Sequence, residues 1–141
     1  YAKYHPAGSL GKKLILKVED LMSMDADNAI VEVSATLKDA VVELSRKGLG
    51  IVSVVNSNGS LVGVITDGDL RRQLEKGEDV YSLHVFDIMT KMPITINKGK
   101  LAVEALNLMK EKNISCMPVI EGESPVGIIR LQDVVKAGII G

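Results

Sequence analysis

The spacing of apolar residues along the chain predicts a helix over residues 36–48, "TLKDAVVELSRKG". Its apolar residues recur at i, i+3, i+4 and i+7, which places them on one helical face. These residues are Leu37, Ala40, Val41 and Leu44. Thr36 and Asp39 have the spacing of a capping box, and Gly48 suits the end of the helix. The segment therefore predicts an amphipathic helix with one buried face.

Continuous apolar runs on either side of a turn predict the strands that follow. The runs are "IVSVV" (51–55) and "LVGVIT" (61–66), and "NSNG" between them has the composition of a hairpin turn. A second helix is expected from near Asp67 to Gly77, and a short strand, "AIVEV" (29–33), is expected ahead of the first helix. The predicted order is strand, helix, strand, strand, helix.

The whole pattern occurs twice. "VEDLM" (18–22) returns as "VFDIM" (85–89), and "LVGVITDGDLRR" (61–72) returns as "PVGIIRLQDVVK" (125–136), in the same order. We therefore predict an α+β fold in which two copies pack sheet against sheet about a pseudo-twofold axis. A single copy is so small that its independent folding would be marginal.

The repeat sets the predicted domain boundaries. Residues 13–76 form the first repeat, 77–84 a linker and 85–141 the second repeat. Residues 1–12 are expected to be a tail that belongs to an upstream domain. The chain opens without an initiator methionine, so a piece of a longer protein is the simplest interpretation.

Composition excludes several classes of partner. Of 141 residues, 46% are hydrophobic but only 3% are aromatic, so the core must be aliphatic and no stacking platform for nucleic acid is present. Lys and Arg number 17 against 18 Asp and Glu, a balance that does not favour nucleic acid or an anionic membrane. No apolar run approaches the length that spans a membrane, and no secretory signal is visible.

The residues that most often carry metal or thiol chemistry are few. Cys116 is the single cysteine, which excludes an internal disulfide and suits the cytoplasm. Because Cys116 lies in the apolar run "ISCMPVI", we expect a buried, inert thiol. His5 and His84 are far apart and have no ligand-like neighbours, so no metal site is expected.

Thr66 and Asp69, at the junction of the second hairpin strand and its helix, have two interpretations. Their spacing can cap the helix, because hydroxyl and carboxylate oxygens accept hydrogen bonds from free backbone N–H groups. The same two side chains can instead hold a ligand at the end of a strand. The two roles are compatible only in part, since a carboxylate that caps the helix keeps one oxygen well placed for a ligand.

The repeat, the order of elements and the segments "GVITDGDL" and "GIIRLQDV" resemble a tandem pair of CBS domains, a Bateman module. The resemblance covers nearly the whole chain and implies that a nucleotide-type effector, such as AMP, ADP or ATP, binds in a cleft between the two sheets. It implies that Thr66 and Asp69 contact ribose hydroxyls, because a carboxylate can accept from both vicinal hydroxyls. Gly63 would let the backbone approach the ligand closely. The remaining implied ligand contacts are Ile65, Met117, Pro118, Gly127, Arg130 and Asp133.

The second copy departs from this motif, because Arg130 stands where the first copy has Thr66 while Asp133 matches Asp69. A guanidinium cannot accept a hydrogen bond from a sugar, but it pairs well with phosphate or carboxylate. Arg130 therefore holds either an anionic part of the ligand or an ion pair with Asp133 or a nearby Glu. Met117 and Pro118 either line the base pocket or pack in the core, and Arg71 and Arg72 either reach a phosphate or lie on a solvated helix face.

The segment "HPAGSLGKKLILKVEDLM" (5–22) is similar to the junction between a sugar isomerase (SIS) domain and a CBS pair in arabinose 5-phosphate isomerases. That resemblance implies a parent enzyme that interconverts ribulose 5-phosphate and arabinose 5-phosphate, in the pathway to the lipopolysaccharide sugar Kdo. His5 would be an acid/base residue of the parent isomerase. This chain by itself is expected to be no enzyme and to need no cofactor.

Two functions remain open at this stage. The first is a regulatory module that binds an adenosine nucleotide or a CMP-sugar such as CMP-Kdo and modulates the upstream isomerase domain. The second is a ligand-free structural module that mediates dimerisation of the parent enzyme. The second function requires apolar residues on exposed helices, for which Leu70, Leu74 and Val134 are the candidates. A homodimer through the CBS pairs is expected in either case.

Overall fold

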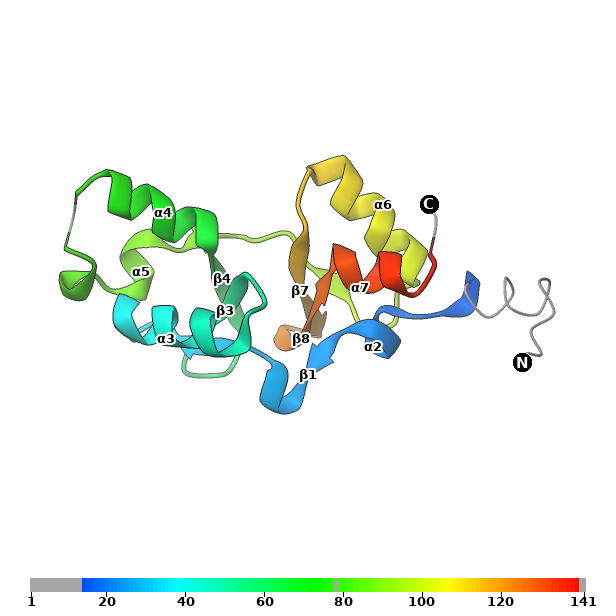
Figure 1. Ribbon diagram of the computed structural model, residues 1–141. Coiled ribbons are helices and arrows are strands. Elements are labelled where there is room, and N and C mark those ends of the chain that lie inside the picture. The colour runs from blue at the N-terminus through cyan, green and yellow to red at the C-terminus, as the bar shows by residue number, and fades with distance from the viewer. Residues whose placement is uncertain (1–13, 78, 140–141) are drawn as a thin grey trace.

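The structure is a computed structural model that describes residues 14–77 and 79–139 (Figure 1). It contains two four-stranded sheets. The first has the strand order β2 (Ile30–Glu32), β3 (Ile51–Val55), β4 (Leu61–Thr66), β5 (Thr90–Lys91). The second has the order β1 (Ser23–Met24), β8 (Ser124–Arg130), β7 (Cys116–Glu121), β6 (Ile96–Asn97). The two sheets confirm the predicted duplicated α+β fold.

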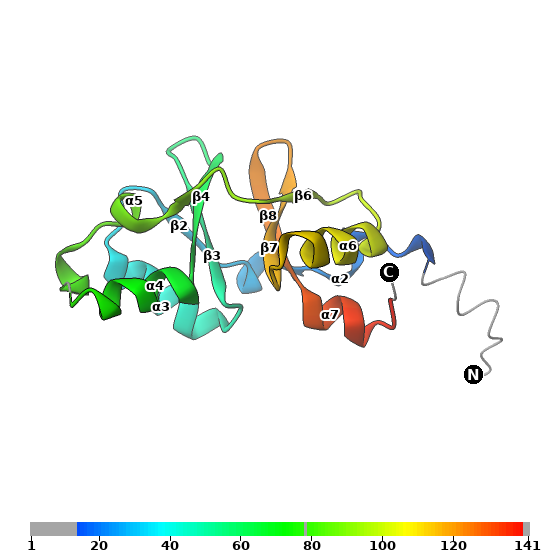
Figure 2. The same cartoon turned by 90° about the horizontal axis from the view of Figure 1, so that it is seen from above.

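The helices of the described residues follow the same duplication. The α-helices are α2 (Val18–Leu21), α3 (Leu37–Lys47), α4 (Asp67–Glu75), α5 (Val85–Ile88), α6 (Ala102–Lys112) and α7 (Leu131–Lys136). Two short 3-10 helices are η1 (Asp25–Asp27) and η2 (Val80–Ser82). In the first half α3 and α4 lie on one side of their sheet, and α6 and α7 do the same in the second half (Figure 2).

Local chemistry explains where α3 begins and ends. The Thr36 hydroxyl accepts from the Asp39 N–H at 3.3 Å, and the Asp39 carboxylate accepts from the Thr36 N–H at 3.4 Å. At the other end Gly48 has φ 64°, a left-handed conformation that glycine adopts without a steric penalty. The capping box and the glycine stop predicted from the sequence are therefore both confirmed.

The leading segment of each repeat lies on the sheet of the other repeat. Strand β1 pairs antiparallel with β8, and β5 pairs antiparallel with β4. The buried residues of the short helices follow the same exchange, because Val18 joins the core under the second sheet and Val85 joins the core under the first. The predicted boundaries 13–76 and 85–141 describe the repeat in the sequence; as boundaries of folding units they stay a prediction.

Two apolar cores hold the helices onto the sheets. In the first, Val52 and Val54 of β3 pack with the apolar face of α3; in the second, Met117 and Val119 of β7 pack with α6. Ile128 of β8 belongs to the first core, so the two sheets are in contact with each other. Burial of this aliphatic surface is the main stabilising term of the fold.

Candidate functional site

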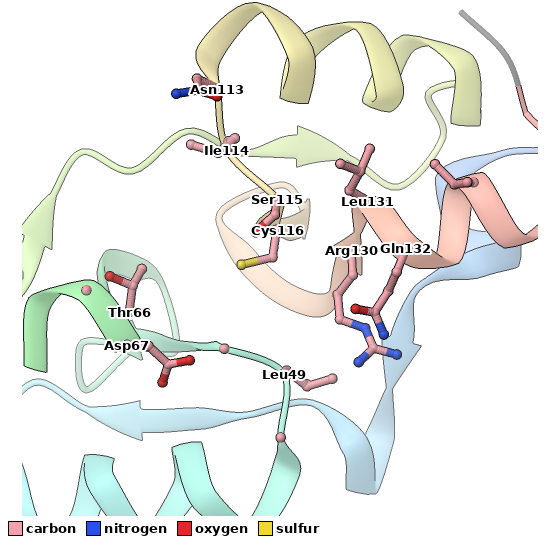
Figure 3. A pocket seen from close by; sticks show the side chains of 14 residues that line it. Leu49, Thr66, Asp67, Asn113, Ile114, Ser115, Cys116, Arg130, Leu131 and Gln132 are labelled. Carbon is pink, nitrogen blue, oxygen red and sulfur yellow. The ribbon is translucent and has the colours of Figure 1, made fainter. Parts of the chain in front are cut away.

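A cleft of about 740 Å³ lies between the two halves (Figure 3). The first half contributes residues 48–50 and 66–68, and the second contributes 113–116, 130–132 and Val135. These are matching positions of the two repeats, at the edge where one hairpin strand begins and the other ends. The cleft therefore lies on the pseudo-twofold axis.

Equivalent backbone hydrogen bonds fix the two walls of the cleft. The N–H of Asp67 donates to the Gly50 carbonyl at 3.3 Å, and the N–H of Leu131 donates to the Ser115 carbonyl at 2.8 Å. Each bond ties the first residue of a helix to the loop that precedes the neighbouring strand. The backbone of the two walls is therefore equivalent, and the walls differ only in their side chains.

The two walls carry different chemistry. Asp67 presents an exposed carboxylate from the first wall, and Arg130 presents a guanidinium from the second (Figure 3). Cys116 also lines the cleft, half-buried, and burial raises the pKa of its thiol above the ordinary value. The cleft offers an acceptor on one side and an anion-binding group on the other, with a neutral thiol between them.

Thr66 and Asp69 act as a helix cap. The Thr66 hydroxyl accepts from the Asp69 N–H at 3.2 Å, and Asp69 Oδ2 accepts from the Thr66 N–H at 3.0 Å. Asp69 also accepts from Arg72 and from the Thr90 hydroxyl. Thr66 lines the cleft, whereas Asp69 is buried behind it and is not among the lining residues. The capping interpretation describes the observed contacts, and a ribose contact at Asp69 stays a prediction.

Arg130 and Asp133 form an ion pair in the second half. Arg130 Nε donates to Asp133 Oδ2 at 2.9 Å, and a terminal nitrogen of the same guanidinium donates to Oδ1 at 3.0 Å. The hydrogen bond with Asp133 is the main reason that the pKa of Arg130 is raised. Of the two interpretations of Arg130, the structure shows the ion pair. Because Arg130 also lines the cleft, a contact with a ligand anion stays a prediction.

Gly63 and Gly127 make close approaches to protein. A Cβ on Gly63 would lie 2.7 Å from Met89 Sδ and 2.9 Å from the Thr90 carbonyl oxygen. A Cβ on Gly127 would lie 2.7 Å from Met22 Sδ and 2.6 Å from the Ser23 carbonyl oxygen. The close approach that we expected between Gly63 and a ligand is made by the exchanged strand β5. Ligand contacts at these glycines stay predictions.

The other predicted contacts lie inside the molecule or outside the described residues. Ile65 and Met117 are buried in the two cores, and Pro118 is buried in β7 opposite Ile128. None of the three is among the residues that line the cleft. His5 lies outside the residues that the structure describes.

Several cleft residues were not anticipated from the sequence. They include Asp67, Asn113, Ser115 and Gln132. The signal was present, because "KGLG" (47–50) and "KNIS" (112–115) occupy the same place in the two repeats and must meet at the pseudo-twofold axis. Polarity alone did not single them out, since each is also an ordinary loop or helix-start residue.

Neither a metal-binding cluster nor a membrane-spanning helix is found within residues 14–77 and 79–139. No three His, Cys, Asp or Glu side chains gather there in a way that could hold a metal ion. None of the helices described there combines the length and the apolar character needed to cross a membrane.

Comparison with known proteins identifies the repeats and two groups of similar proteins. The CBS domain model matches residues 18–76 and 85–139. Arabinose 5-phosphate isomerase KdsD of Escherichia coli K12 is 40% identical over 140 residues, which cover 99% of this chain and 43% of that protein. The Pseudomonas aeruginosa PAO1 enzyme of the same name is 38% identical over 141 residues, with the same shares covered. The chain thus spans 43% of the length of these relatives.

The fold also matches a solved structure that contains a nucleotide. This structure is CBSX2 in complex with AMP, with 28% sequence identity and a TM-score of 0.74. The match covers 87% of this chain and 96% of CBSX2.

Proposed function

The chain belongs to the CBS domain family, and on that premise we propose that it binds an adenosine nucleotide between its repeats and regulates an arabinose 5-phosphate isomerase. The identity of 40% to KdsD supports the link to the isomerase, and the AMP complex of CBSX2 supports the class of ligand. We assign the isomerisation itself to the sugar isomerase domain that the family resemblance implies. Because the chain has a single cysteine and therefore no internal disulfide, we expect a cytoplasmic location.

The observation that carries the proposal is that Thr66 and Arg130 line the same cleft from its two walls. A nucleotide combines a flat apolar base, a sugar with hydroxyls and an anion. Leu49, Ile114 and Leu131 supply apolar surface, Thr66 a hydroxyl, and Arg130 a cation that can hold phosphate. Gly68, in the first turn of α4, also lines the cleft, where the partial positive charge of the helix N-terminus favours an anion.

The regulatory part of the proposal follows from the position of the cleft. A ligand that contacts both walls fixes the two halves relative to each other. Its differential affinity for two arrangements would shift the population toward the one it binds better. The change would reach an upstream domain through α2 and β1, which precede the first repeat core and pack on the second sheet.

A second ligand, CMP-Kdo, fits the same donors and acceptors. It carries a ribose for the Thr66 wall and a carboxylate for Arg130, and as a product of the pathway it would act by feedback. The contacts proposed for Thr66 and Arg130 require a sugar hydroxyl and an anion, which both ligands supply. The base must be distinguished by measurement.

The alternative function is a ligand-free dimerisation module, and exposed apolar residues favour it. Leu74 on α4 is 59% exposed and Val42 on α3 is 45% exposed. Val134, which we also expected on such a surface, is fully buried in the second core, because it faces the sheet beneath α7. Leu70 is half-buried against the first core.

A thermal-shift and calorimetric titration separates these functions. AMP, ADP, ATP, CMP and CMP-Kdo are each added to the chain, and a bound ligand raises the melting temperature with ligand excess over its Kd. Arg130→Gln should weaken binding about 10-fold by removing a charge-assisted bond to the anion. Arg71→Gln, an exposed arginine outside the cleft, is the matched control and should leave binding unchanged. No response to any nucleotide, with a dimer in sedimentation, would favour the structural module.

A further inference from the structure

Asp69 is covered by two side chains that can leave it. Its own side chain is only 7% exposed, yet the side chain of Arg72, which donates to Oδ1, is 63% exposed. Thr90, the second cover, is also an exposed residue. Because the Arg72 guanidinium is largely in solvent, water competes for that end of the ion pair. Both side chains that cover the carboxylate therefore approach it from the exposed side of the molecule.

The Thr90 contact is long and shared between both carboxylate oxygens. Thr90 Oγ1 lies 3.3 Å from Oδ1 and 3.3 Å from Oδ2 of Asp69. A hydroxyl has one proton and can donate to only one oxygen at a time, and O–H···O bonds are usually about 2.7–2.8 Å long. At 3.3 Å the Thr90 hydroxyl is therefore a weak donor to Asp69, and a ligand hydroxyl at the usual distance would compete with it for the same carboxylate.

The contact also joins two repeats. Thr90 is the first residue of β5, the strand that the second repeat contributes to the first sheet, where it pairs with Val64. Asp69 belongs to α4 of the first repeat. The hydroxyl of the exchanged strand thus uses acceptor capacity of Asp69 that a sugar hydroxyl would also need.

We propose that Thr90 is a built-in competitor of the ligand: its hydroxyl takes the place of a ribose hydroxyl at Asp69 in the free protein and is displaced on binding. This inference rests on the proposed function. Thr90 acts through Asp69 and is a positioning residue, so it tunes the affinity for ligands that carry a vicinal diol. One hydrogen-bond donor replaces another in this exchange, and no covalent bond is made or broken.

The second half of the molecule supplies a matched control. Ser23 of β1 pairs with Ile128 as Thr90 pairs with Val64. There the carboxylate of Asp133 is held by Arg130 on both oxygens instead of by a hydroxyl from the exchanged strand. Ser23 therefore has the same place in the fold without the competing role.

The test is a calorimetric titration of the wild-type chain, Thr90→Val, Thr90→Ser and Ser23→Ala with AMP and with 2′,3′-dideoxy-AMP. Thr90→Val keeps the shape of the side chain and suits a strand, so the fold should persist. We expect it to bind AMP about 3- to 10-fold more tightly, the range that one hydrogen bond contributes, and to bind the dideoxy analogue with less than about a 2-fold change. Thr90→Ser and Ser23→Ala should match the wild type.

The outcomes separate this inference from the proposed function. If the wild type binds AMP but Thr90→Val binds it equally or more weakly, Thr90 is not a competitor and the inference is overturned alone. An equal gain for AMP and the dideoxy analogue would also overturn it, because the effect would then not involve the diol. If no form binds AMP, the proposed function fails and this inference fails with it. Should Thr90→Val not fold, Thr90→Ala removes the same hydroxyl and is judged by the same criteria.

Discussion

The sulfur of Met89 lies 2.7 Å from the position that a Cβ on Gly63 would occupy, so β5 can pair with β4 only because residue 63 has no side chain. Gly127 has the same relationship with Met22 in the second sheet. Both glycines are therefore requirements of the strand exchange, since each admits the methionine that precedes the exchanged strand.

Gly63→Ala should lower the free energy of unfolding by about 1–3 kcal/mol, the usual cost of overpacking. The added methyl meets the Thr90 carbonyl as well as Met89, and the backbone cannot move aside as a flexible side chain can. Urea denaturation measures the change. Gly127→Ala should behave alike.

Gly68→Ala is the matched control for these substitutions. Its Cβ would lie 3.5 Å from Arg72 and 3.6 Å from the Thr66 hydroxyl, which are ordinary contacts, and Gly68 lies in α4, where alanine is the better helix former. Gly68→Ala should leave stability unchanged or raise it by up to about 1 kcal/mol. An equal loss in Gly68→Ala and Gly63→Ala would mean that the close approach of β5 is not the cause.

Thr66→Ala should cost about 1 kcal/mol of stability, because the Asp69 N–H loses the hydroxyl that accepts from it. Thermal unfolding followed by circular dichroism checks the value, and Thr66→Ser should restore it. Thr36→Ala removes the same kind of cap from α3, away from the cleft. The two alanine variants should match in stability and differ in AMP binding, which only Thr66→Ala should weaken; equal AMP affinities would count against a ligand role for Thr66.

Arg130→Thr gives the second repeat the residue that the first repeat has at Thr66. It removes an ion pair whose side chains are 25% and 23% exposed, and it supplies a hydroxyl that can cap the N–H of Asp133. The two effects oppose each other at about 1 kcal/mol each, so stability should change by less than about 1 kcal/mol. Urea denaturation with and without AMP tests this. A loss of several kcal/mol would show that the ion pair holds the fold together.

Cys116 should react slowly with iodoacetamide at neutral pH. Burial raises the pKa of its thiol, so the thiolate, the reactive form, is scarcer at pH 7 than in an exposed cysteine, and the rate should rise only at higher pH. Because Cys116 is the single cysteine, mass spectrometry reports its labelling without interference, and the urea-unfolded chain is the control. AMP should slow labelling further, since Cys116 lines the cleft. A folded rate equal to the unfolded rate would contradict the burial of the thiol.

The elements could be predicted where local chemistry determines them. Thr36, Asp39 and Gly48 define α3 by themselves, and the runs 51–55 and 61–66 form strands at their predicted positions. The strand exchange could not be predicted in this way. "VEDLM" and "VFDIM" each show an apolar face that must pack on a sheet. Each could pack beside Gly63 of the first sheet or beside Gly127 of the second, and the sequence pattern does not say which.

The site was predictable in position more than in detail. Thr66 and Arg130 do line the cleft, because the repeat fixes where strand ends meet. One partner of Asp69 is Thr90, which is distant in sequence and reaches Asp69 only through the exchange. Long-range hydrogen bonds of this kind leave no local pattern in a single sequence.

The exchange of β1 and β5 makes each sheet dependent on both repeats, so a chain shortened to one repeat would lack strands that the structure pairs. Deletion of residues 85–141 would remove β5 from the edge of β4 and leave β1 without β8 to pair with. The shortened product would expose an unpaired strand edge, the kind of surface on which chains aggregate. Loss of one repeat therefore creates a surface prone to aggregation in addition to removing half of the cleft.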